Sequence, residues 1–103
     1  MSWKGRRVAI VGAHAFDAEV MAGGVAALAA SQGAQVTLVH MTLGEKGHRN
    51  LPPDVYARQK REEAEAAARV LGARCRFLNF EDAHLNADRA TTEAVAEVIR
   101  EIK

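Results

Sequence analysis

The sequence predicts an α/β fold of the order βαβαβα, and three observations support it. Three short apolar runs, two of them rich in β-branched residues, read as strands. Between and after them, apolar residues recur at the spacing of a helix, and glycine or proline marks the boundaries. Strands that alternate with helices form parallel sheets with right-handed crossovers, so we expect a Rossmann-like, three-layer unit.

The first half of the chain is predicted to hold two strands and one helix. Val8–Val11 forms the core of the first strand, which we place at residues 7–12. A helix is expected over Asp17–Ser31, with Gly33 as its stop, and the second strand at residues 35–40. The apolar positions that indicate this helix are Met21, Val25 and Leu28.

The second half is predicted to hold two helices and one strand. After a loop with Pro52 and Pro53, Asp54 is the expected N-cap of a helix that ends at Leu71, before Gly72. A short third strand is placed at residues 74–78. Asp88 is the expected N-cap of the last helix, whose apolar stripe comprises Ala94, Val95, Val98, Ile99 and Ile102.

Composition fits one globular domain spanning residues 1–103 and excludes several partner classes. Hydrophobic residues make up 49% of the chain and charged residues 26%. A net charge of +1 with interspersed signs argues against nucleic-acid binding, and no apolar segment approaches a membrane span. Cys75 is the only cysteine, so we expect no internal disulfide and a cytoplasmic location.

The first strand is expected to lie at the edge of the sheet. The usual strand order for this connectivity is 3-2-1, which leaves the first strand without a neighbour on one side. This strand is apolar on both faces, as buried parallel strands are. Because an unpaired apolar edge is a liability, we expect either a longer protein or a homo-oligomer that covers it.

Polar side chains follow the first strand where ligands bind in parallel α/β sheets. A neutral imidazole and a carboxylate, His14 and Asp17, are suitable ligands for zinc, although a catalytic zinc needs three protein ligands and a water. The alternative is that Asp17 is the helix N-cap and His14 a loop residue.

Other candidates lie on the loops that follow the second and third strands. Glu45 and His48 belong to the first of these loops and could reach the same site. Glu81, Asp82 and His84 belong to the second and form either a substitute ligand set or an ordinary polar loop. His40 ends an apolar strand and is expected to be structural.

Three motifs resemble the PIG-L/LmbE-like, zinc-dependent N-acetylglucosaminyl deacetylases. The segment Ala13–Glu19 is similar to that family's Ala-His-Pro-Asp-Asp-x-Glu signature, and Gly23-Gly24 follow it. Thr42–Gly47 is similar to its Thr-x-Gly-Glu-x-Gly loop, and the next helix carries Arg61 and ends in Leu-Gly. The resemblance covers the whole chain but only the amino-terminal part of the family's fold.

The resemblance implies roles for individual residues. His14 and Asp17 match two zinc ligands, Glu19 matches a carboxylate behind them, and Arg61, or Arg58, lies where a substrate-contacting arginine is found. Glu45 and His48 are expected near the substrate. The family's third ligand is a histidine from a loop after a fourth strand, beyond residue 103.

The family's general base is the first Asp of its Asp-Asp pair, and this chain has Phe16 there. The resemblance therefore implies a zinc-dependent deacetylase for N-acetylglucosamine-type substrates or other N-acyl amino sugars, with poor activity. Losing a positioned base costs about 10²–10⁴ in rate, unless Glu45 or Asp82 replaces it. The alternative is an inactive or impaired α/β module for metal binding, ligand binding or assembly.

Overall fold

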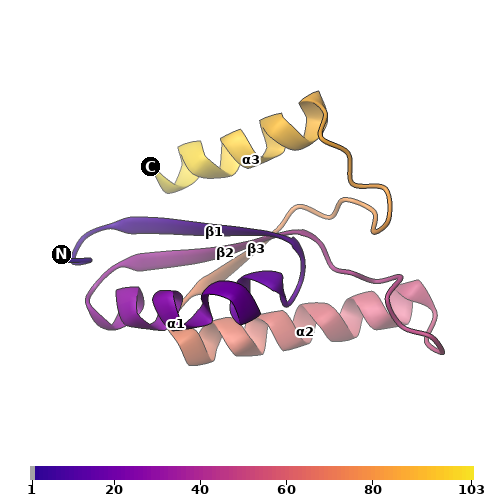
Figure 1. Cartoon of the computed structure of the whole chain (residues 1–103), viewed down its shortest axis with the longest axis horizontal. Coiled ribbons are helices and arrows are strands. Elements are labelled where there is room, and N and C mark those ends of the chain that lie inside the picture. Colours follow the sequence, from indigo (N-terminus) through magenta and orange to yellow (C-terminus); the bar gives the residue numbers. More distant parts are fainter. Residues whose placement is uncertain (1) are drawn as a thin grey trace.

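A computed structural model describes residues 2–103 and has the predicted element order (Figure 1). The elements are β1 (Arg7–His14), α1 (Asp17–Ser31), β2 (Gln35–Thr42), α2 (Pro53–Leu71), β3 (Arg74–Phe77) and α3 (Arg89–Ile102). Helices α1 and α2 lie on one side of the sheet and α3 lies on the other, which gives the three layers (Figure 1).

The three strands are parallel and lie in the order β1-β2-β3, so β1 is an edge strand as expected. The register pairs His14 at the end of β1 with Thr42 at the end of β2. Strand β2 is the centre of the core, because Val36, Leu38 and Val39 are almost fully buried in it. The carboxyl ends of the strands therefore meet at one edge of the sheet.

Most helix boundaries match the sequence signals, and one N-cap prediction is wrong. Helix α1 spans the predicted residues, and Gly72 ends α2 in the left-handed conformation with φ 76°. The Asp88 carboxylate accepts a hydrogen bond from the backbone N–H of Thr91 at 3.0 Å, which confirms it as the cap of α3. Asp54, however, lies inside the first turn of α2, because Pro52 is the N-cap and Pro53 the first helical residue.

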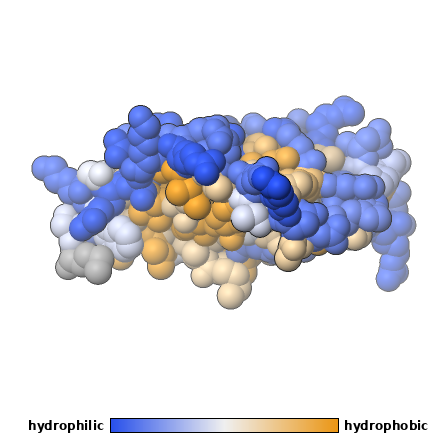
Figure 2. Space-filling view, turned by 90° about the horizontal axis from the view of Figure 1, so that it is seen from above, coloured by the Kyte–Doolittle hydropathy of each residue, from blue (hydrophilic) through white to orange (hydrophobic). Residues whose placement is uncertain are grey.

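The large apolar residues that indicate α1 do not form its buried face. Its buried positions are small residues, including Ala18, Ala26 and Ala29, and they allow the helix to lie close to the sheet. The exposed large residues on the outer side are Val20, Met21, Val25 and Leu28. Together with Val11 of the edge strand they leave much apolar surface uncovered. Figure 2, which is seen from the α3 side of the sheet, shows hydrophobic surface gathered in the middle of that face as well.

Helix α3 covers the other side of the sheet with part of its predicted stripe. Val98 is buried, whereas Ile99 is 57% exposed. Within residues 2–103 no helix is both long and apolar enough to cross a membrane.

Candidate functional site

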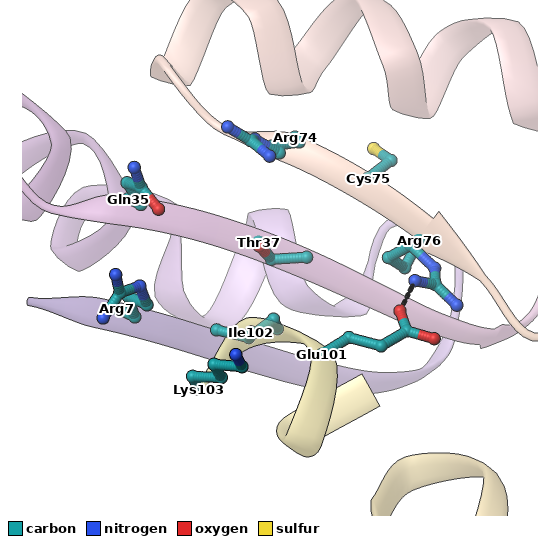
Figure 3. A pocket seen from close by; sticks show the side chains of 9 residues that line it. All are labelled: Arg7, Gln35, Thr37, Arg74, Cys75, Arg76, Glu101, Ile102 and Lys103. Atoms are coloured by element: carbon teal, nitrogen blue, oxygen red, sulfur yellow. Dashed lines mark hydrogen bonds and ion pairs between the residues drawn. The ribbon is translucent and has the colours of Figure 1, made fainter. Parts of the chain in front are cut away.

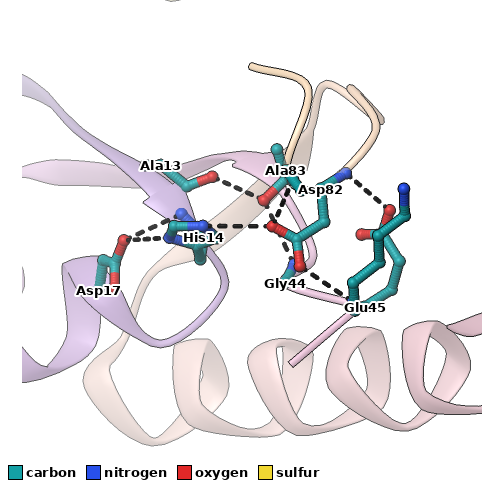
Figure 4. A network of polar contacts seen from close by, with 9 residues as sticks. Ala13, His14, Asp17, Gly44, Glu45, Asp82 and Ala83 are labelled. Atoms are coloured by element: carbon teal, nitrogen blue, oxygen red, sulfur yellow. Dashed lines mark hydrogen bonds and ion pairs between the residues drawn. The ribbon is translucent and has the colours of Figure 1, made fainter. Parts of the chain in front are cut away.

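The loops after β1, β2 and β3 meet at the carboxyl ends of the strands and share one polar network (Figure 4). Two hydrogen bonds join the first loop to the end of β2. The backbone N–H of Ala15 donates to the carbonyl of Thr42 at 3.0 Å, and the Thr42 hydroxyl donates to the carbonyl of Ala13 at 2.8 Å. His14 is thereby held between these anchored residues.

Asp17 binds back to His14 from the first residue of α1. Its Oδ2 accepts from the backbone N–H of His14 at 2.9 Å and lies 3.2 Å from the ring Nδ1. Asp17 is not the N-cap, since that position is Phe16. At the start of a helix its negative charge is favoured by the helix dipole. About half of each side chain is exposed, so the pair remains accessible.

The other ring nitrogen of His14 faces Asp82 from the loop after β3. The distance from Nε2 to Asp82 Oδ1 is 3.3 Å. Asp82 is buried, and its oxygens accept from the backbone N–H groups of Lys46 and Ala83, each at 2.9 Å. Its own N–H donates to Glu45 Oε2 at 2.8 Å. The structure thus places Asp82 beside His14, and Glu45 binds Asp82 in turn.

The backbone at Gly44 packs against the side chain of His14. Its φ of +70° is a conformation that glycine adopts without strain. A Cβ built on Gly44 would lie 3.5 Å from the Cβ of His14, so the backbone of the second loop packs directly against this histidine.

Phe16, which stands where the family resemblance leads us to expect a base, has an unusual backbone. Its φ is 96°, which is rare for a bulky residue, and its side chain is largely exposed. A cavity of about 250 Å³ adjoins it, lined among others by Glu19, Lys60 and Glu63. The Lys60 ammonium lies 5.3 Å from the centre of the Phe16 ring.

Behind this loop lie Glu19, His40 and Cys75, of which His40 is fully buried and the other two are partly buried. Glu19 Oε2 accepts from the backbone N–H of Phe16 at 3.2 Å, while its Oε1 lies 3.8 Å from His40 Nε2. Burial lowers the pKa of His40 below its ordinary value, although the Glu19 charge acts against this shift. Burial also raises the pKa of the Cys75 thiol to about 11. His40 is fully buried and stacks on Phe77, which fits the expected structural role.

The remaining candidates are engaged elsewhere in the described part of the chain. His48 Nδ1 accepts from the backbone N–H groups of Asn50 and Leu51 in its own loop. Arg61 donates to Asn79 Oδ1 at 2.8 Å and stacks on Phe77. His84 is exposed and lies 3.9 Å from a Glu81 oxygen. None of the three contacts His14 in the structure, so their roles at the site stay predictions.

A cavity of about 360 Å³ lies at the opposite end of the strands, against α3 (Figure 3). Its charged lining residues are Arg7, Arg74, Arg76, Glu101 and Lys103. Arg76 and Glu101 pair with each other. Because Arg7 and Arg74 begin their strands whereas His14 ends β1, this cavity is separate from the His14 site.

His14 and Asp17 fit a divalent ion as two ligands of an incomplete set. Ligands about 2.0–2.2 Å from a tetrahedral zinc lie roughly 3.3 Å apart, close to the 3.2 Å between His14 Nδ1 and Asp17 Oδ2. Within residues 2–103, no three His, Cys, Asp or Glu side chains form a group able to hold a metal ion. Each ring nitrogen of His14 instead faces a different carboxylate.

Comparison with known proteins agrees with this geometry. The family model described as PIG-L, GlcNAc-PI de-N-acetylase, matches residues 9–103. The chain belongs to the PIG-L family. The family resemblance and the α/β fold predicted from the sequence are therefore confirmed.

PIG-L relatives of this chain include both hydratases and deacetylases. It is 34% identical over 101 residues to the 4-oxalmesaconate hydratase of Pseudomonas putida, a match that covers 91% of this chain and 39% of the hydratase. A crystal structure of the 4-carboxy-2-hydroxymuconate hydratase from the same species superposes with a TM-score of 0.86 at 33% identity, over 94% of this chain and 43% of that one.

The N,N'-diacetylchitobiose deacetylase of Pyrococcus horikoshii superposes with a TM-score of 0.88 at 27% identity, over 93% of this chain and 37% of that one. The chain thus spans about two fifths of the length of these PIG-L relatives.

Proposed function

We propose that this chain carries part of the active site of a metal-dependent hydratase, which adds water to a carbon–carbon double bond conjugated with a carbonyl or carboxylate group. His14 and Asp17 would hold the divalent ion, with zinc as the expected metal. The proposal is supported by the sequence identity to the Pseudomonas hydratase and by the residue at position 16.

The identity to the hydratase carries the proposal, and Phe16 weighs against the deacetylase alternative. Phe16 stands between the two ligand candidates, where the deacetylase signature has its base, and its ring can neither accept nor donate a proton. Hydrolysis of an amide requires a proton for the departing amine as well as an activated water. Addition of water to a double bond has no departing amine, but it still moves one proton from the water and one to a substrate carbon, so residues other than Phe16 would have to make both transfers.

The ion would supply an activated water at neutral pH and would polarise a substrate oxygen. The residues of this chain would orient the ion through the His14–Asp17 pair and bind the substrate beside Phe16. Lys60 lines the adjoining cavity and places a cation 5.3 Å from the Phe16 ring centre, a position suited to a substrate carboxylate. Arg61, on the same helix, is a second candidate for this contact.

A deacetylase acting on N-acyl amino sugars is the second candidate function. It is favoured by the His14–Asp17 match to the signature and by the superposition on the diacetylchitobiose deacetylase. Because Phe16 replaces the base, we expect this activity to be about 10²–10⁴-fold below that of a site with a positioned base.

Two assays on the same zinc-loaded protein distinguish the candidates. Hydration of 4-carboxy-2-hydroxymuconate destroys conjugation and is followed as a loss of ultraviolet absorbance. Acetate release from N,N'-diacetylchitobiose measures deacetylation. We expect His14-dependent hydration and little acetate, with His14→Ala as the control. Acetate release that depends on His14 and exceeds hydration would favour the deacetylase, and inactivity in both assays would favour the non-catalytic module.

A further inference from the structure

The cavity between the amino ends of the strands and the end of α3 lies far from the His14 site. Its volume of about 360 Å³ suits a small molecule (Figure 3). Arg7 begins β1 and His14 ends it, so at about 3.3 Å per residue the two lie roughly 23 Å apart. A small ligand in this cavity would therefore not reach the residues proposed to bind the metal ion.

The alternation of side chains along the strands places several arginines on one face of the sheet. Arg74 and Arg76 lie two residues apart on β3, so both point to the same face. Arg74 is the register partner of Thr37 on β2, and Arg7 is the partner of Gln35, two residues before Thr37. All five residues line the cavity, so they share the face of the sheet that α3 covers.

Positive charge in the cavity exceeds the negative charge available to balance it. The lining includes four cationic side chains and one carboxylate. The carboxylate, Glu101, already pairs with Arg76. Neither Arg7 nor Arg74 forms an ion pair with any residue from 2 to 103. Two guanidinium groups that line the cavity are therefore without a counter-ion in the described part of the chain.

Thr37 adds a buried hydrogen-bond donor to these two arginines. It lines the cavity from the central strand and is only 6% exposed. Its hydroxyl forms no hydrogen bond within residues 2–103, whereas those of the other buried threonines, Thr42 and Thr91, each donate to a backbone carbonyl. Buried hydroxyl groups are usually hydrogen-bonded, so this donor beside two unpaired guanidinium groups indicates a site for an anion.

We propose that this cavity binds a phosphate group, either in pyrophosphate or in a phosphorylated small molecule. Arginine side chains form paired hydrogen bonds with phosphate oxygens, and a threonine hydroxyl donates a further one. Arg7 and Arg74 approach from the two strands that flank β2, and Thr37 lies on β2 between them. A diphosphate group has enough oxygens to bind all three side chains at once. This site is independent of the proposed hydratase function.

The test is calorimetric titration of the full 103-residue chain with sodium pyrophosphate at low ionic strength. Metal is omitted because pyrophosphate chelates divalent ions. We expect the wild type to bind one pyrophosphate, and Arg74→Gln to weaken the affinity about 10-fold or more, since a hydrogen bond to a charged group is lost. Thr37→Val keeps the shape of the side chain and removes its hydroxyl, and it should weaken the affinity by a similar factor.

Arg6→Gln is the matched control, because it removes the same charge from the exposed residue before Arg7, which does not line the cavity. We expect its affinity to equal that of the wild type. Absence of binding to the wild type would overturn the proposal. An equal loss in Arg6→Gln and Arg74→Gln, or a Thr37→Val affinity equal to that of the wild type, would show diffuse attraction to a basic surface and would also overturn it. If Thr37→Val does not fold, the comparison at the exposed Arg74 decides.

Backbone amide chemical shifts locate the ligand in the same titration. Pyrophosphate should shift the signals of Thr37 and Arg74 and leave that of His14 unchanged, whereas shifts centred on His14 would overturn the placement. ADP serves as the second ligand. Tighter binding of ADP would identify a phosphorylated small molecule as the ligand, and tighter binding of pyrophosphate would identify the free anion. Because neither metal nor substrate is present, the result stands whether or not the chain is a hydratase.

Discussion

Gly12→Ala should damage both stability and the His14–Asp17 site. A Cβ on Gly12 would lie 3.1 Å from the Cβ of Asp17 and 3.2 Å from the backbone nitrogen of Ala18. The first turn of α1 would therefore have to move by a few tenths of an ångström. Overpacking costs about 1–3 kcal/mol, and the lower entropy of the unfolded alanine chain returns up to about 1 kcal/mol.

The expected net loss is about 1–2 kcal/mol, which lowers the Tm of a domain of this size by roughly 4–16 °C. Zinc retained after dialysis should also decrease, because Asp17 is displaced. Gly24→Ala is the matched control: nothing lies within 4 Å of its built Cβ, and it should stabilise α1 by about 0.5–1 kcal/mol. The reasoning is refuted if Gly12→Ala melts at or above the wild-type temperature.

Three further predictions concern metal, pH and assembly. Dialysed His14→Ala should retain less zinc than the wild type, and equal contents would exclude His14 as a ligand. Burial lowers the pKa of His40, so the unfolded chain binds a proton at this histidine more readily than the folded chain does. The free energy of unfolding should therefore fall as the pH decreases below about 6.5. In His40→Gln, the urea midpoint of unfolding should fall less over the same pH range. We also propose that a second copy covers the free edge of β1, so light scattering should give a dimer; a monomer would contradict it.

Much of the fold could be predicted because its signals are local. The span of α1, the Gly72 stop and the Asp88 cap each depend on a few neighbouring residues. The Asp54 prediction failed because two cap signals competed. Proline at Pro53 has the φ of a first helical residue and needs no N–H partner, so the helix begins one residue before Asp54.

The inner face of α1 could not be predicted from hydrophobicity. Periodicity identifies which residues share a face but not how close the helix lies to the sheet. Ala26 and Ala29 are fully buried because their small side chains permit close approach, while Met21 is 85% exposed. The buried face of α1 is therefore determined by the small size of its side chains rather than by their hydropathy.

The location of the candidate site at the carboxyl ends of the strands could be predicted from the sequence, but its individual side-chain contacts could not. Parallel topology brings the loops after the three strands together, so the proximity of Asp82 to His14 and of Glu45 to Asp82 follows from the fold. Which residue of the last loop turns inward depends on backbone donors such as the Lys46 N–H. Such long-range hydrogen bonds have no signal in a single sequence.

The backbone of Phe16 is held in the loop by hydrogen bonds that do not involve its side chain. Its φ of 96° is held by the hydrogen bond from its N–H to Glu19 and by the bond that its carbonyl accepts from the Val20 N–H at 3.0 Å. With ψ at −33° this conformation lies outside the left-handed region in which Asp is enriched, so its cost of order 1–3 kcal/mol applies to Asp as it does to Phe. Phe16→Asp should therefore leave Tm unchanged, while it places a carboxylate between His14 and Asp17. Higher acetate release in this variant, without loss of stability, would show that position 16 selects the reaction on an otherwise common scaffold. A large decrease in Tm would show instead that the Phe16 ring itself supports the loop.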